Sequence, residues 1–424
     1  MRVQCIGGGP AGLYTAIALK RQDPRHDVTV WERNARGVTH GWGVVFWDDL
    51  LDEMHRVDPA SASAVRDAAV VWDGQAVQVG RRSPVFLGGA GYAIGRQRLL
   101  TLLGDRAEAL GVDLRYATAA PEDLAGPGLR AGEPASLVVA ADGAGSGLRR
   151  RRTEELGTRL AAGRNRYLWS GTPALFSTFT FGFVDTGSGW IWCHAYRFDE
   201  TTSTFIVEAP PDTWAALGFA DLATPACLDL LAEIFDPVLH GAPLLAGRSE
   251  DARAPWQTFR RVTNERWCDG RLALAGDAAH TTHFAIGSGT RLALGDAVAL
   301  AEHVREVELD EHLAAALASY DARRRPEIRP LQDEALRSSA WFEDPVGLLE
   351  QGDDLGLGWS LWQRRRRAPA WRWYLHRASQ HAPMRRVRTS AGTLRRHVRA
   401  RRRRWSVPLS AGPARPRATV GEER

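Results

Sequence analysis

Three glycines near the start of the chain have the spacing that brings a backbone close to a phosphate. Gly7, Gly9 and Gly12 fit the pattern G-x-G-x-x-G. The first two let N–H groups approach a pyrophosphate, and the third lets a helix pack closely against a strand. Glu32 lies 20 residues beyond Gly12, at the distance where a carboxylate accepts the hydroxyls of a ribose. The spacing predicts a dinucleotide site and leaves FAD and NAD open as its ligand.

The residues on both sides of this turn predict the elements that the motif needs. Residues 3–6 are apolar enough for a buried strand, residues 13–21 have the spacing of an amphipathic helix, and residues 27–32 predict a second strand. Together they form a βαβ unit, which is the context that binds dinucleotides. A purely structural glycine turn is the weaker alternative, because it needs no acid at position 32.

Further strand and helix patterns follow along the chain. Residues 164–208 alternate aromatic and polar residues, which is typical of β-sheet. The other predicted elements are helices at 96–110 and 290–305, and strands at 112–116, 137–141 and 271–275. We find no internal repeat in the sequence. This layout indicates a nucleotide-binding domain made of separated segments, with a β-rich domain inserted.

The length and composition are those of a globular enzyme of at least two domains. The chain has 424 residues, more than the roughly 250–300 at which a single core stops growing. Its 44% hydrophobic and 25% charged residues exclude collagen-like and wholly disordered proteins. No apolar run reaches the ~18–20 residues of a membrane span, and the sequence opens on a strand pattern rather than a signal peptide. We therefore expect a cytoplasmic protein without a membrane span.

The net charge of +5 conceals two parts of opposite sign. Residues 355–424 contain 19 arginines and only two acidic residues, so the rest of the chain is negatively charged. Arginine clusters interleaved with tryptophan are able to bind RNA, anionic lipid or a phosphorylated substrate. The plainer interpretation is a partly helical or disordered tail that stays solvated or rests on the acidic body. We do not expect nucleic acid to be the partner.

Two further turns resemble elements of the single-component, FAD-dependent aromatic hydroxylases of the p-hydroxybenzoate hydroxylase type. Residues 142–149, which begin with Asp142, resemble the D-G-x-x-S-x-x-R element of that family. Residues 276–280 resemble its G-D element, in which the aspartate contacts the FAD ribose and pyrophosphate region. Arg96 resembles the arginine that opens a helix beside the FAD phosphates. Three such elements favour FAD, because a NAD dehydrogenase needs only the glycine motif.

Longer strings resemble one branch of that family. This branch includes the salicylyl-CoA 5-hydroxylases, the 2-aminobenzoyl-CoA monooxygenases and, as relatives, the violacein-pathway hydroxylases. The resemblance covers residues 2 to about 346 and departs from the wider family at His283, in its proline-rich loop, and at Arg291, where an asparagine is usual. The matching strings are residues 41–46, 163–169, 194–196, 202–208 and 279–290.

The resemblance implies a mixed α/β fold with a Rossmann-like FAD-binding domain, an inserted β-sheet substrate domain and a C-terminal helical, arginine-rich tail. We place the FAD-binding domain in residues 1–75, 96–160 and 269–335. The substrate domain is expected in a hairpin at 76–95 and a β-rich region at 161–268. A connecting helix at 336–355 and a basic, partly disordered tail at 356–424 complete the chain.

The resemblance also implies the reaction. Such enzymes reduce FAD with NADPH or NADH, capture O₂ at flavin C4a and hydroxylate an electron-rich aromatic ring through the resulting hydroperoxide. Backbone N–H groups of residues 287–290 are expected at the flavin pyrimidine edge, where a helix N-terminus favours negative charge. The expected cofactor-binding residues are Gly7, Gly9, Pro10, Ala11, Gly12, Glu32, Arg33, Arg96, Asp142, Gly276, Asp277, Gly287, Ser288, Gly289 and Thr290.

On the substrate side His283 is the candidate catalytic residue, because its loop is expected to face both the flavin and the substrate. An imidazole that titrates near neutrality takes up a phenolic proton. The alternative is a histidine that only hydrogen-bonds within its loop. The expected pocket walls, which are otherwise ordinary loop and sheet residues, are His40, Trp42, Trp192, His194 and Tyr196.

The favoured substrate is an aryl-CoA or carrier-bound aryl thioester, whose phosphates arginines such as Arg164 and Arg166 would meet. The alternative is an indole or another aromatic natural product. A halogenase needs an active-site lysine, and the only lysine, Lys20, lies on the first predicted helix. The four cysteines are scattered, which argues against a disulfide reductase and a metal site. A non-catalytic flavin-binding or nucleic-acid-binding protein is the alternative of another class, and a monomer or homodimer is expected.

Overall fold

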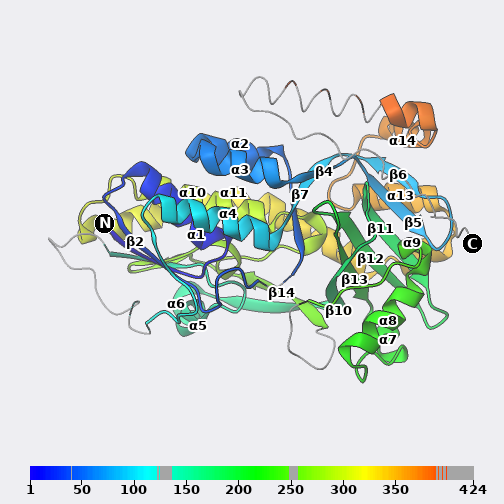
Figure 1. The fold of residues 1–424 in the computed structure, drawn as a ribbon, viewed down its shortest axis with the longest axis horizontal. Coiled ribbons are helices and arrows are strands. Elements are labelled where there is room, and N and C mark those ends of the chain that lie inside the picture. The colour runs from blue at the N-terminus through cyan, green and yellow to red at the C-terminus, as the bar shows by residue number, and fades with distance from the viewer. Residues whose placement is uncertain are drawn as a thin grey trace, which may run out of the picture.

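The computed structural model describes residues 1–39, 41–121, 124, 136–247 and 256–387, together with residues 390, 394 and 398. Within these residues the chain forms two large sheets, a small third sheet and a layer of helices (Figure 1). The first sheet and its helices lie toward the N-terminal side of the view, and the second sheet lies toward the other side (Figure 1). This division gives the mixed α/β fold that the sequence predicts.

The first sheet contains the parallel strands that the glycine motif requires. Its strand order is β15-β16-β9-β1-β2-β8, and β1 pairs in parallel with both β2 and β9. The strands are β1 (Arg2–Ile6), β2 (Asp27–Trp31), β8 (Asp113–Arg115), β9 (Ser136–Ala140), β15 (Cys268–Asp269) and β16 (Leu272–Leu274). Strand β9 follows β8 in the sequence, and β16 comes after all strands of the second sheet. This sheet is thus assembled from separated segments of the chain.

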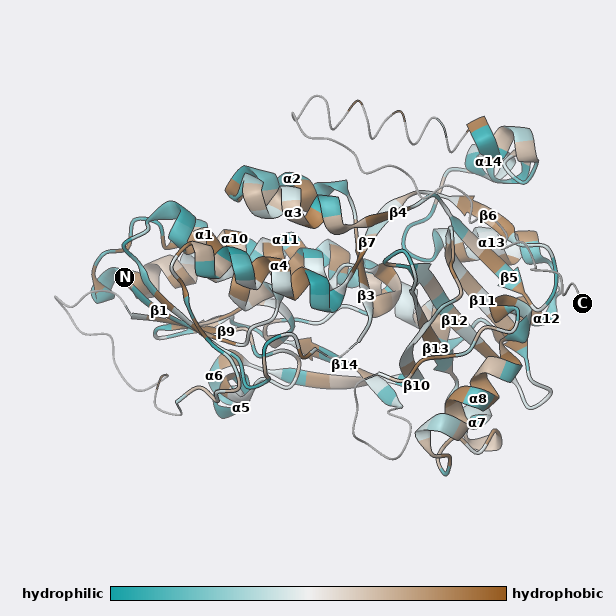
Figure 2. Ribbon diagram, viewed as in Figure 1, coloured by the Kyte–Doolittle hydropathy of each residue, from teal (hydrophilic) through white to brown (hydrophobic). Residues whose placement is uncertain are grey.

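Helices cover both faces of this sheet. Helix α1 (Pro10–Gln22) packs against α4 (Arg96–Ala109) and α10 (Gly289–His303), and α10 packs against α11 (Asp310–Glu343). These helices form one layer, while α5 (Gly147–Arg151) and α6 (Thr153–Leu156) lie on the opposite side (Figure 1). Figure 2 shows hydrophobic residues along the strands and hydrophilic residues on outward turns of the helices. The core of this half therefore lies between the sheet and its main helical layer.

The second sheet is built mainly from antiparallel strands. Its order is β14-β10-β13-β12-β11-β5-β6. The strands are β5 (Gln75–Val79), β6 (Val85–Gly88), β10 (Arg159–Thr172), β11 (Phe179–Asp185), β12 (Trp190–Arg197), β13 (Ser203–Ala209) and β14 (Gln257–Thr263). Strands β5 and β6 thus join the sheet of the later β-rich region, with β5 parallel to β11. Side chains from both faces of its central strands are buried, which explains their aromatic composition.

The remaining elements connect and cover the two sheets. The small sheet has the order β3-β7-β4, and short helices flank the second sheet (Figure 1). These elements are β3 (Gly43–Phe46), β4 (Val70–Trp72), β7 (Gly91–Gly95), α2 (Asp48–Val57), α3 (Pro59–Ala68), α7 (Pro211–Ala216), α8 (Thr224–Ile234) and α9 (Asp236–Leu239). Two 3₁₀ turns, η2 (Gly276–Ala278) and η3 (Phe284–Ile286), precede α10.

The C-terminal part differs from the expected connecting helix and separate tail. Helix α11 runs without a break across the predicted boundary at residues 335/336. Pro326 and Pro330 lie inside it, and the two carbonyls that lose an N–H partner belong to the exposed residues Ala322 and Pro326. The tail then begins within α13 (Asp354–Gln363), which follows α12 (Val346–Glu350) and precedes α14 (Trp371–Ala378). Much of the predicted tail, including residues 401–424, lies outside the described residues.

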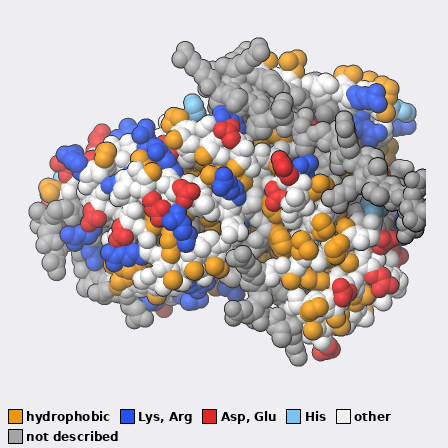
Figure 3. All heavy atoms as spheres, in the orientation of Figure 1, with side chains coloured by type: hydrophobic (Ala, Val, Ile, Leu, Met, Phe, Trp, Pro, Cys, Tyr) orange, Lys and Arg blue, Asp and Glu red, His pale blue; other side chains and the backbone are white. Residues whose placement is uncertain are grey.

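The surface and the helices bear on two further expectations. On the face drawn in Figure 3, basic and acidic side chains are interspersed over the first sheet and its helices. None of the helices in the described part of the chain combines the length and the apolarity that crossing a bilayer requires. Because acidic and basic side chains are interspersed over the first sheet on the face in Figure 3, the positive net charge of the whole chain is not concentrated there.

Candidate active site

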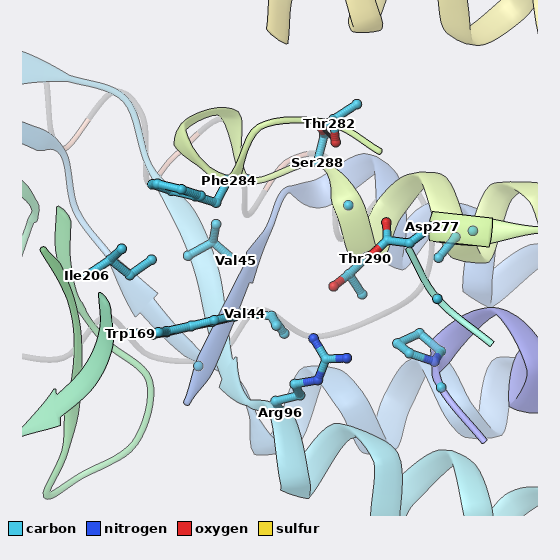
Figure 4. A pocket seen from close by; sticks show the side chains of 18 of the residues that line it. Val44, Val45, Arg96, Trp169, Ile206, Asp277, Thr282, Phe284, Ser288 and Thr290 are labelled. Carbon is cyan, nitrogen blue, oxygen red and sulfur yellow. Dashed lines mark hydrogen bonds between the residues drawn. The ribbon is translucent and has the colours of Figure 1, made fainter. Parts of the chain in front are cut away.

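A cavity of about 260 Å³ lies where the two large sheets approach each other. Its walls come from the β1–α1 turn, β3, the η2 and η3 turns, the start of α10 and strands β10–β14. Figure 4 shows Arg96 and Asp277 at one end and the apolar side chains of Trp169, Ile206 and Phe284 at the other. The cavity therefore has a polar end beside the first sheet and an aromatic end beside the second.

A second cavity of about 110 Å³ adjoins the polar end. Gly9 and Arg96 line both cavities, and Glu32, Arg36 and Tyr116 line only the second. Arg96 begins α4, and its Nε donates to Thr39 Oγ1 at 3.0 Å. Burial lowers the pKa of Arg96, whereas the nearby Asp277 opposes that shift. The Arg96 side chain therefore lies where the two cavities meet.

The glycine turn has the geometry that its motif predicts. Gly7 has a φ of +108°, in the region that favours glycine, and a Cβ on Gly12 would clash with the Gly7 carbonyl oxygen. A Cβ on Gly9 would meet nothing within 4 Å, so the turn leaves open space above its N–H groups. The Glu32 carboxylate accepts from the Gly8 N–H at 2.8 Å. The turn and the acid therefore lie together at the second cavity.

The Gly276–Asp277 turn is held by a buried ionic cluster on two helices. Asp296 of α10 accepts from the Gly276 N–H at 2.9 Å and lies 2.7 Å from His280 Nε2. Arg324 of α11 donates to the other Asp296 oxygen at 2.9 Å. Burial would raise the pKa of Asp296, but the charges and hydrogen bonds of His280 and Arg324 lower it. The cluster fixes the turn so that Asp277 projects into the cavity.

Asp277 and the loop after it form one side of the cavity. Enclosure by the surrounding protein raises the pKa of Asp277, and nearby His280 and Arg96 oppose that rise. Gly287 has a φ of +61°, and Ser288 Oγ lies 3.0 Å from Thr282 Oγ1. Ser288 makes no side-chain cap to α10, so the first N–H groups of that helix are available at the cavity wall.

The turn at Asp142 lies behind the cavity and is tied to the Asp277 turn. Asp142 Oδ2 accepts from the Gly147 N–H at 2.8 Å, and Oδ1 is buried without a partner among the described residues. Its neighbours Ala141 and Gly143, rather than Asp142 itself, line the cavity. Arg149 is buried and donates to Ala278 O at 3.0 Å. All three turns thus converge on one region.

The expected pocket walls divide into three groups. His194 and Tyr196 line the cavity, and the Tyr196 hydroxyl donates to Gly43 O at 2.7 Å. Trp192 and Trp42 do not line it. Trp192 stacks on Phe342 at the end of α11, and Trp42 packs against Gly171. Trp192 shares the sheet face of His194, but the end of α11 covers that part of the strand. His40 lies outside the described residues.

His283 lies behind the cavity wall rather than in it. It lines a separate space of about 10 Å³ together with Glu208 and Tyr167, and its Nδ1 accepts from the Ala285 N–H at 3.3 Å. Burial lowers the pKa of His283 to about 4, so its imidazole is neutral at neutral pH. The η3 turn directs the next residue, Phe284, into the cavity. The expectation that the His283 ring faces the large cavity is therefore not met.

Several wall residues were not singled out from the sequence. Trp169 and Tyr167 alternate on β10 and share the cavity face, and Arg36 rather than the exposed Arg33 lines the second cavity. Glu208 contacts His194 of the cavity wall, and Arg364 donates to the carbonyl of Ala285 in the η3 turn. The alternation on β10 was a usable signal for the first pair. No local pattern marks Glu208 or Arg364.

The comparisons with known proteins agree with this geometry. The family described as "FAD binding domain" matches residues 1–335. Salicyloyl-CoA 5-hydroxylase from Streptomyces sp is 38% identical over 355 residues, which are 81% of this chain and 65% of that protein. The 3-hydroxy-4-methyl-anthranilyl-[aryl-carrier protein] 5-monooxygenase of Streptosporangium sibiricum is 34% identical, over 81% of this chain and 89% of that protein. The chain thus spans less than two thirds of the first relative's length.

Two more distant similarities extend the comparison. Protodeoxyviolaceinate monooxygenase of Chromobacterium violaceum is 30% identical over 81% of this chain and 89% of that protein. The crystal structure of a 2-methyl-3-hydroxypyridine-5-carboxylic acid oxygenase mutant superposes with a TM-score of 0.62 at 21% identity, covering 86% of this chain and 98% of that one. The last similarity concerns the fold alone.

Proposed function

Because this chain belongs to the family of FAD-binding aromatic monooxygenases, we propose that it hydroxylates an electron-rich aromatic ring carried on a CoA or carrier-protein thioester. The observation that carries the proposal is that two cavities adjoin at Gly9 and Arg96, with a polar end at the glycine and aspartate turns and an aromatic end beyond. A dinucleotide with a flat ring system needs such an extended, two-part site.

The residues around the two cavities fit FAD. The open space above Gly9, the Glu32 carboxylate and the Arg96 guanidinium suit an adenosine and a pyrophosphate. The start of α10 at Gly289 suits a ring edge that becomes negative. When bound and reduced by NADPH or NADH, FAD supplies the chemistry that transfers one oxygen atom of O₂ to the ring. The cofactor-binding residues named from the sequence, apart from Arg33, are part of this proposal.

The aromatic end shields and orients the substrate ring. Trp169, Phe179 and Phe284 present apolar surfaces that exclude water and offer edge or face contacts to an aromatic ring. Burial raises the pKa values of Tyr167 and Tyr196, so both hydroxyls stay protonated. We propose that His283 lies behind this wall, where its Nδ1 accepts from the Ala285 N–H and supports the η3 turn, and that it does not contact the substrate.

Arg260 is the cation that we propose for the phosphates of a CoA substrate. It is exposed on β14, directly after Phe259 of the cavity wall. Its charge opposes the rise that burial causes in the pKa of Tyr167, another residue of that wall. Arg166, one of the arginines named from the sequence, instead lies 5.2 Å over the Trp214 ring on α7. The Arg164 backbone N–H is bonded to Glu343 at 2.9 Å.

We expect Arg260→Gln to raise KM for salicyloyl-CoA roughly tenfold, because one charge-assisted contact to phosphate is lost. The KM for free salicylate should stay the same, since that molecule carries no phosphate. Arg261→Gln, on the opposite face of the strand, is the matched control. Equal effects of Arg260→Gln on both compounds would contradict this role.

The experiment that tests the function is NADPH oxidation by the FAD-loaded chain with salicyloyl-CoA, 2-aminobenzoyl-CoA, tryptophan and free salicylate. We expect stimulated oxidation and a product heavier by one oxygen atom with a thioester. Stimulation that yields only hydrogen peroxide with all four compounds would contradict the proposal. Oxygenation of tryptophan alone would favour the second candidate, a hydroxylase of an indole natural product, which the similarity to protodeoxyviolaceinate monooxygenase supports.

We further propose that the chain works in the cytoplasm as a monomer or homodimer, and that nucleic acid is not a partner. The interspersed charges on the face in Figure 3 support the last point, because nucleic-acid sites concentrate positive charge. A gel-shift assay with RNA at physiological salt should show no complex, and size-exclusion chromatography gives the oligomeric state.

A further inference from the structure

Most of the exposed large apolar side chains lie near the C-terminal end of the described chain. Eleven large apolar side chains are exposed in the part of the chain that the structure describes, and seven of them lie beyond residue 370. These seven are Trp371, Tyr374, Leu375, Met384, Val387, Leu394 and Val398. Single exposed apolar residues are ordinary on a protein surface, whereas a concentration of them marks a contact site.

Helix α14 carries the first three of these side chains on the face that points away from the body. Trp371, Tyr374 and Leu375 follow the i, i+3, i+4 spacing of one helix face and are 52–68% exposed. The opposite face is packed, because His376 is buried there and its ring lies 5.7 Å from that of Trp359 on α13. Figure 2 shows hydrophobic and hydrophilic residues on this helix. Helix α14 therefore rests on the body and leaves its apolar face uncovered.

The chain directly after α14 is attached to the edge of the second sheet. The Gln380 side chain accepts from the Phe86 N–H at 2.8 Å and donates to the Phe86 carbonyl oxygen at 2.9 Å. Phe86 lies on β6, the last strand of that sheet, so the amide bonds to backbone groups that a further strand would use. These contacts fix the orientation in which α14 presents Trp371, Tyr374 and Leu375.

A second helical stretch after α14 continues the same pattern. The described residues of this stretch that are helical are 382–387, 390, 394 and 398. Its apolar residues follow one another at steps of three, seven and four, which a period of 3.6 places on one helix face. They are 44–65% exposed and comprise Met384, Val387, Leu394 and Val398. A second apolar stripe thus follows that of α14.

Exposed arginines without an acidic partner surround these apolar side chains. Those that form no ion pair with another described residue are Arg366, Arg367, Arg372, Arg377, Arg385 and Arg386. The sequence contains no acidic residue between Asp354 and Glu422 that could neutralise them locally. Residues 371–387, 394 and 398 thus form one surface, named the α14 surface, that is both apolar and positively charged.

The mixture of side chains on the α14 surface fits the surface of an anionic bilayer. A second copy of the chain would bring arginines against arginines, which costs free energy. Single-stranded RNA pairs with arginines and stacks on aromatic rings, but it leaves aliphatic side chains such as Leu375 and Val387 without a use. A bilayer offers phosphates to the arginines, the headgroup level to Trp371 and Tyr374, and the acyl boundary to the aliphatic side chains.

We propose that the α14 surface docks the protein on the anionic lipid surface of a membrane. The two helical stretches lie in the plane of the interface, the arginines contact the headgroup phosphates, and the apolar side chains enter the boundary with the acyl chains. None of the residues of this surface lines either of the two cavities, so the inference does not depend on the proposed reaction.

The test is flotation of the full chain with vesicles of phosphatidylcholine alone and with vesicles of equal parts phosphatidylcholine and phosphatidylglycerol. We expect binding to the mixed vesicles only, and this binding should weaken as salt rises, because salt screens the arginines. Leu375→Ser should weaken it roughly tenfold, because one aliphatic side chain no longer enters the acyl boundary. Leu160→Ser is the matched control, since Leu160 on β10 is 54% exposed and Leu375 is 52% exposed.

A second pair of variants tests the charges. Joint replacement by Arg372→Gln and Arg377→Gln should weaken binding to the mixed vesicles roughly 10- to 30-fold, because each cation near an anionic surface contributes about fivefold. Arg151→Gln is the control, because Arg151 is exposed on α5, which lies far from α14 (Figure 1). All variants should melt at the temperature of the unaltered chain, since each replaced side chain is exposed.

Three results would overturn this inference. One is equal binding of the unaltered chain to both kinds of vesicle, or binding to neither. Another is a Leu375→Ser variant that binds the mixed vesicles as tightly as the unaltered chain, because charge alone would then explain the binding. The third is capture of polyuridine or of an acidic acyl carrier protein in place of the mixed vesicles, which would assign the α14 surface to a nucleic acid or to a protein.

Discussion

Arg96 is the residue at which the two cavities meet, and its contribution is open to direct measurement. Its guanidinium is half-buried beside Asp277 and lines both spaces. Arg96→Met removes a charge-assisted donor worth about 1.5–3 kcal/mol, so FAD should bind roughly 10- to 100-fold more weakly. Fluorescence titration of the FAD-free chain measures this affinity.

Arg98→Met is the control for Arg96, because Arg98 lies on the same helix and is exposed. It should leave FAD affinity unchanged. Equal affinities of Arg96→Met and the unaltered chain would show that the pyrophosphate lies elsewhere.

The burial of His283 makes the free energy of unfolding depend on pH below neutrality. Burial lowers its pKa to about 4, whereas an unfolded histidine titrates near 6.5. Below about pH 6.5 His283 is therefore protonated in the unfolded chain but stays neutral in the folded chain. The folded chain loses stability relative to the unfolded chain as pH falls from about 6.5 toward 4. The expected loss between about pH 7 and about pH 5 is about 2 kcal/mol.

His283→Gln should remove this part of the acid sensitivity. Urea unfolding at the two pH values should show a decrease in unfolding free energy that is about 2 kcal/mol smaller than in the unaltered chain. Parallel pH dependence in both proteins would mean that His283 is not held neutral by burial.

The loop between η2 and α10 is the element that decides the shape of the cavity. Gly287 has a left-handed conformation, and a Cβ there would clash with Val45 of β3 and lie 3.0 Å from the Trp47 ring. Gly287→Ala should lower the unfolding free energy by about 2–3 kcal/mol, because it combines backbone strain with a steric overlap. Thermal or urea unfolding of the FAD-free chain measures the effect.

Gly289→Ala is the matched control two residues away. A Cβ at Gly289 meets nothing within 4 Å and its φ is negative, so the change should stay within about 0.5 kcal/mol. If both variants were equally stable, the close contact between the loop and β3 would not exist in solution.

Elements with a local signal were predictable from the sequence, and contacts between distant elements were not. The glycine turn, α4, α10 and strands β1, β9 and β16 follow from residue spacing. Phe284 lines the cavity where we expected His283, and this depends on the direction in which the η3 turn points its side chains. The pairing of His194 with Glu208 depends on the register of β12 and β13, which the sequence alone does not fix.

At the scale of the whole molecule, the C-terminal helices are part of the body that holds the site. Leu357 and Leu361 of α13 are buried against β5 and β6. Arg364 donates to Ala285 O at 3.0 Å and lies 5.2 Å over the Phe181 ring. Burial lowers the pKa of Arg364 to about 9. An arginine from beyond the matched family region thus contacts the η3 turn at the cavity.

Two truncations separate this packed part from the rest of the tail. A chain that ends at Val387 keeps the buried leucines of α13 and the Arg364 contact, so its unfolding free energy and its FAD affinity should stay close to those of the full chain. A chain that ends at Gly352 loses two buried leucines worth about 1.5–3 kcal/mol each, and loses the Arg364 contact. Its melting temperature and FAD affinity should both fall. Equal behaviour of the two truncated chains would show that α13 does not support the site.

The central claim is that FAD spans the two cavities through the junction at Arg96, with its ring system facing the aromatic end. The most direct test is a crystal structure of the chain soaked with FAD and salicyloyl-CoA. We predict the adenosine next to Glu32, the flavin ring at the start of α10, and the substrate ring between the flavin and His194. Electron density for the flavin ring outside this cavity, or for a substrate ring out of reach of it, would contradict the account.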